Sequence, residues 1–188
     1  MSDMHHEEKK YSIFQIAINL TIACLISGVI ISGVYYFTHP LAVKNAEMLL
    51  KQSMRELVAD ADDFKPVEGH EDWYAAEKGG ETVAYLVPGE AKGYGGAVKV
   101  LVAVSNDGGI IDFSVTKANE TPGLGTKAFE DDFRSQYWGK SSDALIVTKD
   151  PKNTENIQAI TGATITSRAV TAAVKEAVDA VLEFTGGE

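Results

Sequence analysis

Residues 97–116, AVKVLVAVSNDGGIIDFSVT, decide the fold of the part of the chain that contains them. Residues 97–105 are nearly continuous in Val, Leu and Ala, which is typical of a strand buried on both faces. Residues 106–109 have the composition of a hairpin turn, because Asn, Asp and Gly tolerate positive φ. Apolar and polar residues then alternate through residues 111–116, as in a strand with one buried face. The stretch predicts an antiparallel hairpin.

Further elements are expected on both sides of this hairpin. Residues 82–87 predict a preceding strand, and residues 145–148 and 157–160 predict two short later strands. A closing helix, ended by Gly186-Gly187, is indicated by an apolar stripe of Val170, Val174, Ala177, Val178 and Val181. The predicted fold class is therefore α+β, with an antiparallel sheet and flanking helices.

A long uncharged segment precedes this domain. Residues 11–37, 27 positions in all, contain no charged side chain, whereas a helix needs roughly 20 apolar residues to cross the hydrocarbon core of a membrane. The segment is too long for a secretory signal and ends in Tyr35, Tyr36 and Phe37, residue types favoured at a lipid interface. We expect a single uncleaved transmembrane helix that ends at His39-Pro40.

The charges that flank this helix predict its orientation. Lys9 and Lys10 precede it and residues 38–43 carry no fixed charge, so the positive-inside rule places the N-terminus in the cytoplasm. Ala46, Leu50, Met54 and Leu57 recur at helical spacing, which predicts a juxtamembrane helix. The segment 60–72 is rich in acidic residues and is predicted to be a linker. Four parts are expected: a cytoplasmic tail (1–10), the transmembrane helix (11–37), the juxtamembrane helix and linker (38–72) and an extracytoplasmic domain (73–188).

Composition excludes several functions. With 17 basic and 27 acidic side chains the formal charge is −10, which disfavours nucleic acid as a partner. The one cysteine, Cys24, cannot form an internal disulfide, and the four histidines lack the spacing of a metal site. His70 is the only histidine after the membrane exit, so a hydrolase with a Ser or Cys nucleophile is disfavoured. We expect neither a metal site nor a catalytic residue in this chain.

Three segments rich in Gly, Thr and Ser are candidates for ligand binding: residues 93–96, 120–127 and 161–167. Glycine lets the backbone approach a ligand, and Thr and Ser add short hydroxyl groups, so we expect the three segments to line one pocket. The third segment leads into the closing helix, whose first N–H groups could bind a phosphate. The alternative is structural: Gly162 makes a turn, Thr166 or Ser167 caps the helix, and Thr126 caps a second helix.

The third segment resembles a known modification site. The residues QAITGAT (158–164), followed by ITSRAV (165–170), are similar to the flavinylation site of the covalent FMN-binding family. This family includes the G subunit of the Rnf ion-translocating electron transport complex and the C subunit of the sodium-pumping NADH:quinone oxidoreductase. The residues TPGLGT (121–126) resemble the family's second flavin-contacting loop. The length of the chain is more similar to that of the Rnf G subunit.

The resemblance implies a covalent cofactor at Thr164, whose hydroxyl would be joined to the phosphate of FMN. Thr166 is the competing attachment site, Arg168 is a candidate partner for the phosphate charge, and Gln158 stands where the family often has Asp. The other cofactor-binding residues that it implies are Thr161, Gly162, Ala163, Thr166, Ser167 and Arg168, together with Glu120, Thr121, Gly123, Leu124, Gly125 and Thr126. The local sequence supplies no base to activate a threonine hydroxyl, so attachment would need the family's flavin transferase, which uses FAD and Mg²⁺.

The resemblance also implies a function. The chain would be a membrane-anchored flavoprotein subunit of an Rnf-type complex, relaying electrons during ferredoxin:NAD⁺ electron transfer coupled to Na⁺ or H⁺ translocation by partner subunits. It would lie in the inner (cytoplasmic) membrane as a single-pass protein. Two alternatives remain: a subunit of the sodium-pumping quinone reductase or another flavin-linked reductase, and an extracytoplasmic binding or assembly module without a cofactor.

Overall fold

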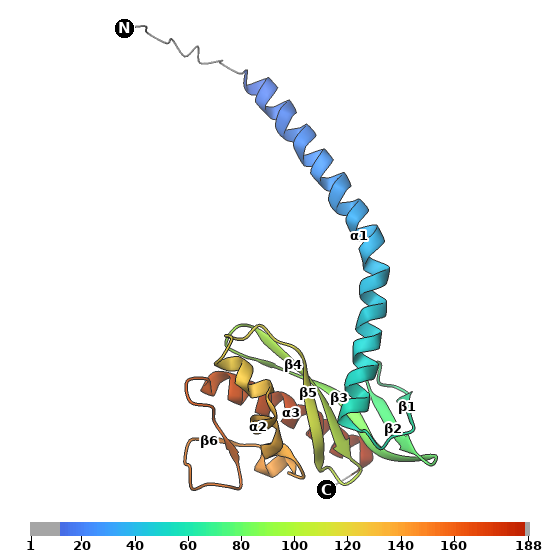
Figure 1. Cartoon of the computed structure of the whole chain (residues 1–188), viewed down its shortest axis with the longest axis vertical. Helices are drawn as coiled ribbons and strands as arrows, with labels where there is room; N and C mark the ends of the chain where they lie inside the picture. Colours follow the sequence, from blue (N-terminus) through green and yellow to red (C-terminus); the bar gives the residue numbers. More distant parts are fainter. Residues whose placement is uncertain (1–11, 187–188) are drawn as a thin grey trace. The chain divides into compact units, whose positions relative to one another are not determined.

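The computed structural model describes residues 12–186 and divides the chain into two compact units, Met1–Leu49 and Leu50–Glu188 (Figure 1). The predicted tail, residues 1–10, lies outside the described residues, as do Tyr11 and Gly187. The described part of the first unit is helical, and the second unit contains all the strands.

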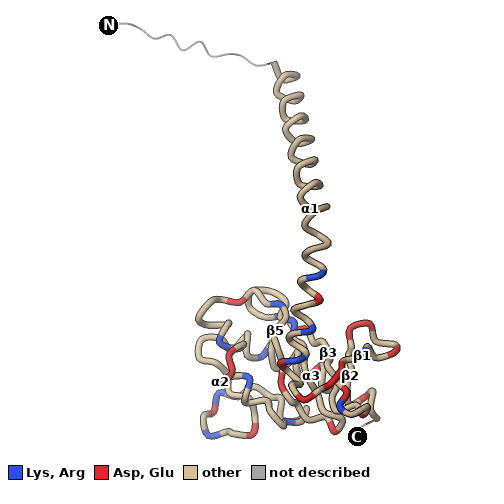
Figure 2. Tube along the Cα trace, turned by 45° about the vertical axis from the view of Figure 1, so that its right-hand side comes forward, with Lys and Arg blue, Asp and Glu red and all other residues tan. Residues whose placement is uncertain are grey.

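The first unit consists of the greater part of one helix, α1 (Ile13–Leu57). This helix is long and apolar enough to cross a membrane, and its side chains before Leu50 are exposed. Charged side chains appear along it only from Lys44 onward (Figure 2). No helix boundary falls at His39-Pro40, because α1 continues through Pro40, and the end of the membrane-spanning part at these residues stays a prediction. A proline removes one backbone hydrogen bond, and the good helix formers that follow it allow the helix to propagate.

The second unit is built on a five-stranded antiparallel sheet in the order β1-β2-β3-β4-β5. The predicted fold class and the hairpin around residues 106–109 are confirmed. Its strands are β1 (Asp63–Pro66), β2 (Tyr74–Lys78), β3 (Glu81–Lys92), β4 (Ala97–Ser105) and β5 (Ile110–Lys117).

The sheet differs from the prediction at its first three strands. The expected linker, residues 60–72, contains β1, which pairs with an unpredicted strand, β2. Strand β3 also extends past the predicted residues 82–87, through Pro88 and Gly89. Gly89 lies where α3 (Thr164–Thr185) crosses the sheet: a Cβ atom there would stand 2.0 Å from the carbonyl oxygen of Ala173. The glycine allows the backbones of helix and strand to approach closely.

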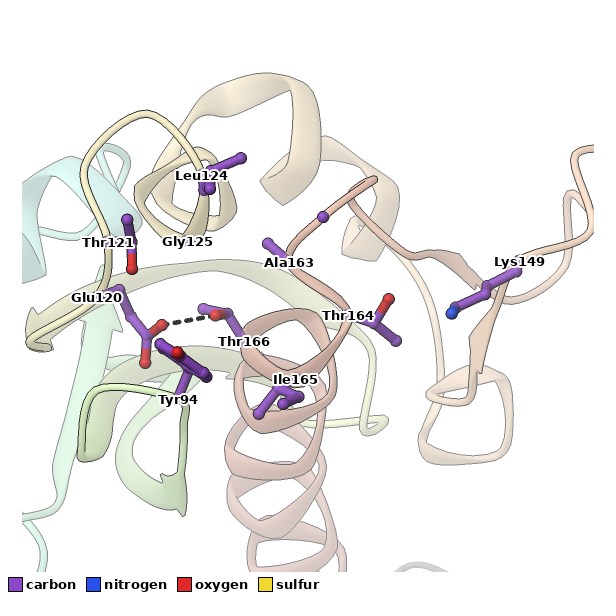
Figure 3. Close-up of a pocket in the computed structure, with 11 residues that line it drawn as sticks. Tyr94, Glu120, Thr121, Leu124, Gly125, Lys149, Ala163, Thr164, Ile165 and Thr166 are labelled. Carbon is purple, nitrogen blue, oxygen red and sulfur yellow. Dashed lines mark hydrogen bonds between the residues drawn. The ribbon is translucent and has the colours of Figure 1, made fainter.

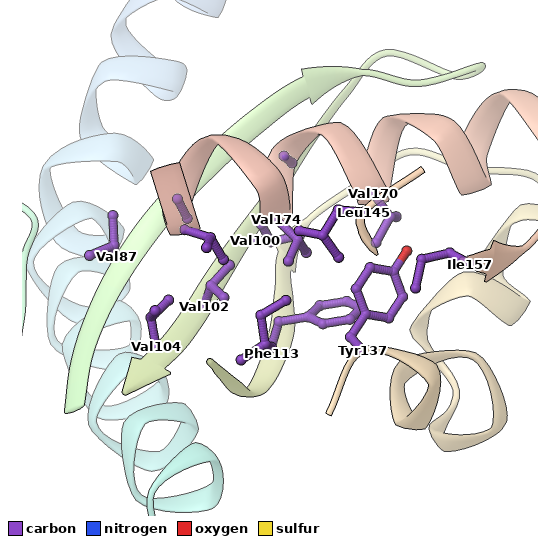
Figure 4. Packing of buried hydrophobic residues seen from close by; sticks show 14 of the residues in the cluster. Val87, Val100, Val102, Val104, Phe113, Tyr137, Leu145, Ile157, Val170 and Val174 are labelled. Carbon is purple, nitrogen blue, oxygen red and sulfur yellow. The ribbon is translucent and has the colours of Figure 1, made fainter. Parts of the chain in front are cut away.

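Both faces of the sheet are covered within the second unit. Alternate residues of β4, from Val98 to Val104, pack with α3, and Figure 4 shows Val100, Val102 and Val104 in this cluster. Leu101 and Ala103 of the same strand pack with Met54 and Leu57 from the last turns of α1. The prediction that residues 97–105 are buried on both faces is confirmed.

Short elements complete the core beside α3. Tyr137 is fully buried against Phe113, with a ring-centroid distance of 5.0 Å, and its hydroxyl lies 2.6 Å from Thr171 Oγ1. Burial raises the pKa of the Tyr137 hydroxyl, so this group remains neutral in the core. The short elements between β5 and α3 are η1 (Gly125–Phe129), α2 (Asp131–Arg134), η2 (Ser135–Tyr137), η3 (Ser142–Ala144), β6 (Val147–Thr148) and β7 (Ile157–Gln158).

Candidate functional site

The three Gly- and Thr-rich segments meet around one cavity of about 620 Å³ in the second unit (Figure 3). Tyr94 comes from the first segment, and Lys149 joins the lining from the loop after β6. The remaining lining residues are Glu120, Thr121, Leu124 and Gly125 from the second segment, and Gly162, Ala163, Thr164, Ile165 and Thr166 from the third.

The start of α3 forms one wall of this cavity. Gly162 makes the preceding turn with φ 82°, and the helix begins at Thr164 with Ala163 as its N-cap. Alanine supplies no capping side chain, and the first turn contains no acidic residue. The N–H groups of this turn lack partners further back in the helix, and the positive end of the helix dipole lies among them. An anion is the ligand that this helix start favours.

Thr166 and Ser167 do not cap the helix, so the capping part of the structural alternative is wrong, whereas its turn at Gly162 is confirmed. Thr166 and Ser167 both lie inside the first turn. The hydroxyl of Ser167 donates a hydrogen bond to the carbonyl oxygen of Ala163 and accepts one from the Ile160 N–H, each at 3.0 Å. Ser167 is fully buried and fixes the turn from inside rather than lining the cavity.

A buried carboxylate joins the three segments. Glu120 is 8% exposed, and its Oε2 accepts a hydrogen bond of 2.6 Å from the Thr166 hydroxyl. Its Oε1 accepts one of 3.1 Å from the Gly95 N–H. Gly125 packs directly on this side chain, since a Cβ there would lie 2.8 Å from Glu120 Oε2. One side chain of the second segment thus holds the first and third segments in place.

The structure places several of the other predicted site residues outside the cavity. Gly123 and Thr126 shape the second loop, where the Gly123 N–H donates to Thr126 Oγ1 at 2.9 Å. Thr126 acts within this loop and caps no helix, since η1 has no side-chain cap. Arg168 is exposed and does not line the cavity. Thr161 lines a neighbouring cavity of about 350 Å³.

Lys149 is the residue that sequence reasoning missed. It follows β6, which pairs in parallel with β7 through Val147↔Ile157 and Thr148↔Gln158. The pairing brings Lys149 to the segment before α3, although 15 positions separate it from Thr164 in the sequence. Because β6 and β7 are only two residues long, no local sequence pattern predicts that Lys149 lies near Thr164.

The lining fits FMN in shape and chemistry. Ligand sites of about 300–1,000 Å³ accept molecules of this size, with apolar walls and a few polar groups. Tyr94, Leu124 and Ile165 offer exposed apolar surface for a flat ring. Lys149 and the first N–H groups of α3 offer positive charge for a phosphate. Within residues 12–186 no group of His, Cys, Asp or Glu could hold a metal ion.

Comparisons with known proteins agree with this geometry. The family model described as "FMN-binding domain" matches residues 93–179, a range that contains all the lining residues of the cavity. The chain is 57% identical over 185 residues to the G subunit of the proton-translocating ferredoxin:NAD(+) oxidoreductase complex of Clostridium ljungdahlii, covering 98% of this chain and 100% of that protein. The chain belongs to the Rnf G-subunit family.

Another member and a structural neighbour extend the comparison. The Rnf G-subunit family includes the G subunit of the Na(+)-translocating ferredoxin:NAD(+) oxidoreductase complex of Acetobacterium woodii, 44% identical over 109 residues, or 56% of this chain and 52% of that protein. The crystal structure of the C subunit of the Na(+)-translocating NADH-quinone reductase from Parabacteroides distasonis superposes with a TM-score of 0.52 and 21% identity, covering 62% of this chain and 63% of that one. At this identity the likeness shows the fold alone.

Proposed function

We propose that this chain is the membrane-anchored electron-carrying subunit of an ion-translocating ferredoxin:NAD⁺ oxidoreductase complex, with FMN joined through its phosphate to Thr164. The relatives named above are subunits of such complexes, and the matched FMN-binding domain contains the cavity. Bound FMN accepts and donates electrons one or two at a time, so a chain that holds it can relay electrons between partners. Before Lys44, the described part of α1 has no charged side chain, so ion translocation belongs to partner subunits.

The state of the two threonine hydroxyls supports Thr164 as the attachment site. Thr166 is 2% exposed and its hydroxyl already donates to Glu120. Thr164 is half-buried and lines both the 620 Å³ cavity and its 350 Å³ neighbour. A transferase can reach the Thr164 hydroxyl while the second unit stays folded, whereas modification at Thr166 would disrupt a buried contact.

The attachment step is a phosphoryl transfer. The oxygen of Thr164 attacks the phosphorus on the FMN side of FAD, the pyrophosphate bond breaks, AMP leaves, and the hydroxyl proton passes to a base. Glu120, the only carboxylate lining the cavity in residues 12–186, is occupied by Thr166 and Gly95. The base is therefore expected on the flavin transferase, which makes this enzyme a maturation partner.

We further propose that the N-terminus is cytoplasmic and that the flavin domain is extracytoplasmic, in the inner membrane. Lys9 and Lys10 precede the apolar helix, and positive charge favours the cytoplasmic side. Single cysteines at residue 5 and at Lys140, in a Cys24→Ser background, test this in intact cells. An impermeant thiol reagent should label position 140 alone, and labelling of position 5 alone would reverse the orientation.

Purification of the native assembly tests the function. A tagged chain extracted in mild detergent should bring the other subunits of a ferredoxin:NAD⁺ oxidoreductase with it and carry FMN that survives denaturation. Membranes that contain the assembly should reduce NAD⁺ with reduced ferredoxin. Recovery of a quinone reductase would favour the first alternative, and recovery of a flavin-free chain would favour the cofactor-free module.

A further inference from the structure

We propose that Lys149 binds the flavin phosphate, and that Gln158 is the positioning residue that fixes the loop carrying Lys149. This inference rests on the proposed function in one respect, namely that the phosphate lies at Thr164. The sequence indicates Arg168 as the candidate partner for the phosphate charge. Arg168 lines neither cavity, whereas Lys149 lines both.

The backbone brings Lys149 to the attachment site. In the parallel pair β6–β7, the Ala159 N–H donates a 2.8 Å hydrogen bond to the carbonyl oxygen of Thr148. Both strands end at the same edge, so the residue after β6 lies beside the segment that leads from β7 to α3. Lys149 is that residue.

The side chain of Lys149 is directed toward Thr164, the proposed attachment site. Lys149, Gly162 and Thr164 line both the 620 Å³ cavity and the 350 Å³ cavity. The lysine and the threonine are therefore neighbours in each of the two cavities. In Figure 3 the ammonium group of Lys149 points toward Thr164. No other Lys or Arg of the described residues lines either cavity.

Lys149 has no competing carboxylate in the described part of the chain. The ion pairs found in residues 12–186 involve other cations and leave Lys149 without an acidic partner. An ammonium group that faces a cavity next to a helix N-terminus is a strong site for a phosphate, because both contribute positive potential. Together they would bind the dianionic phosphate of free FMN and the phosphodiester of the attached cofactor.

Gln158 holds the loop that carries this lysine. Its side-chain amide donates hydrogen bonds to the carbonyl oxygens of Asp150, at 2.8 Å, and of Asn153. Its main-chain N–H donates to Gln136 Oε1 at 2.7 Å. Both side-chain bonds require an N–H donor, which an ionised aspartate does not have. Gln158 thus fixes residues 150–153, directly after Lys149.

The test compares FMN with riboflavin, which lacks the phosphate. The full-length chain is produced without a flavin transferase, purified in detergent and titrated with each flavin by fluorescence. Lys149→Gln should weaken FMN binding by about 5- to 10-fold, the effect of one charged hydrogen bond made by an exposed side chain, and leave riboflavin binding unchanged. Lys149→Arg should retain the preference for FMN. Lys152→Gln is the matched control, because Lys152 is exposed in the same loop and lines neither cavity.

Three results would overturn the role of Lys149: unchanged FMN affinity in Lys149→Gln, an equal loss for both flavins, or a loss as large in Lys152→Gln. Failure of the unmodified chain to bind FMN would also contradict it. Because the titration uses no covalent step, it separates the two proposals. A selective Lys149 effect without modification of Thr164 refutes only the covalent link, whereas modified Thr164 with no Lys149 effect refutes only the phosphate contact.

The role of Gln158 is tested by Gln158→Met, which keeps the size of the side chain but removes its donors. The preference for FMN over riboflavin should fall by about the same factor as in Lys149→Gln, since the loop no longer holds the lysine at the site. The double variant should show little additional loss. Equal weakening of both flavins, or full additivity with Lys149→Gln, would show that Gln158 acts only on general structure.

Discussion

Thr164→Ala should abolish covalent FMN attachment completely. The substitution removes the oxygen that forms the phosphoester. The other hydroxyls of the first turn are buried, and they are bonded to Glu120 in the case of Thr166 and to the carbonyl oxygen of Ala163 in the case of Ser167. The measurement is the fluorescent band on a denaturing gel, together with the intact mass of the chain produced alongside the flavin transferase. Thr164→Ser should remain modified, because serine restores a hydroxyl at the same place.

Thr166 supplies the matched control. Thr166→Ser keeps the hydrogen bond to Glu120 and should be flavinylated like the original chain. Thr166→Ala leaves Glu120 Oε2 without its donor and should lower the free energy of unfolding by about 1–3 kcal/mol, but the flavin band should persist. A band that persists in Thr164→Ala and disappears in Thr166→Ala would move the attachment site to Thr166.

Gly89→Ala should destabilise the second unit by about 2–3 kcal/mol, as expected for overpacking against rigid backbone. The added Cβ would lie 2.0 Å from the carbonyl oxygen of Ala173 and 2.8 Å from its carbon, so α3 would have to move away from β3. Chemical unfolding followed by tryptophan fluorescence measures this change, because both tryptophans, Trp73 and Trp138, belong to this unit.

Gly109→Ala is the control for this substitution. A Cβ at Gly109 would meet only side-chain atoms, at 3.0 Å from Ser105 Oγ and 3.6 Å from Asp107 Oδ1. These side chains can adjust, so the loss should stay below about 1 kcal/mol. If Gly89→Ala and Gly109→Ala unfold at the same denaturant concentration, the contact between α3 and β3 is not as tight as the structure indicates.

The sheet shows which parts of the fold the sequence could predict. The hairpin of β4 and β5 is rich in β-branched residues and has a turn of Asn, Asp and Gly, so local pattern and tertiary structure agree. Strand β2, Tyr-Ala-Ala-Glu-Lys, has no β-branched residue and forms because β3 offers it a partner. Strand β1 ends in Pro66, which an edge strand tolerates because that residue need not donate to a neighbour.

The candidate site also has features that the sequence could predict and features that it could not. Its three segments could be found because glycine and threonine are concentrated in them, and their meeting around one cavity follows from the sheet and α3. Two features could not be found. The bond between Glu120 and Thr166 spans 46 positions, and Lys149 reaches Thr164 only through the parallel pair β6–β7. Both features depend on tertiary contacts, and the residues next to them in the sequence show no pattern that predicts these contacts.

The position of Thr164 at the head of α3 has a consequence for the speed of electron exchange. This helix is 22 residues long, and its inner face, from Ala169 to Val181, forms much of the core. A redox group joined to Thr164, as proposed, would be held by a frame that shifts little when the charge of the group changes. We therefore expect the protein to add little to the reorganisation energy, so that most of it comes from water around the exposed side chains of Tyr94, Leu124 and Ile165.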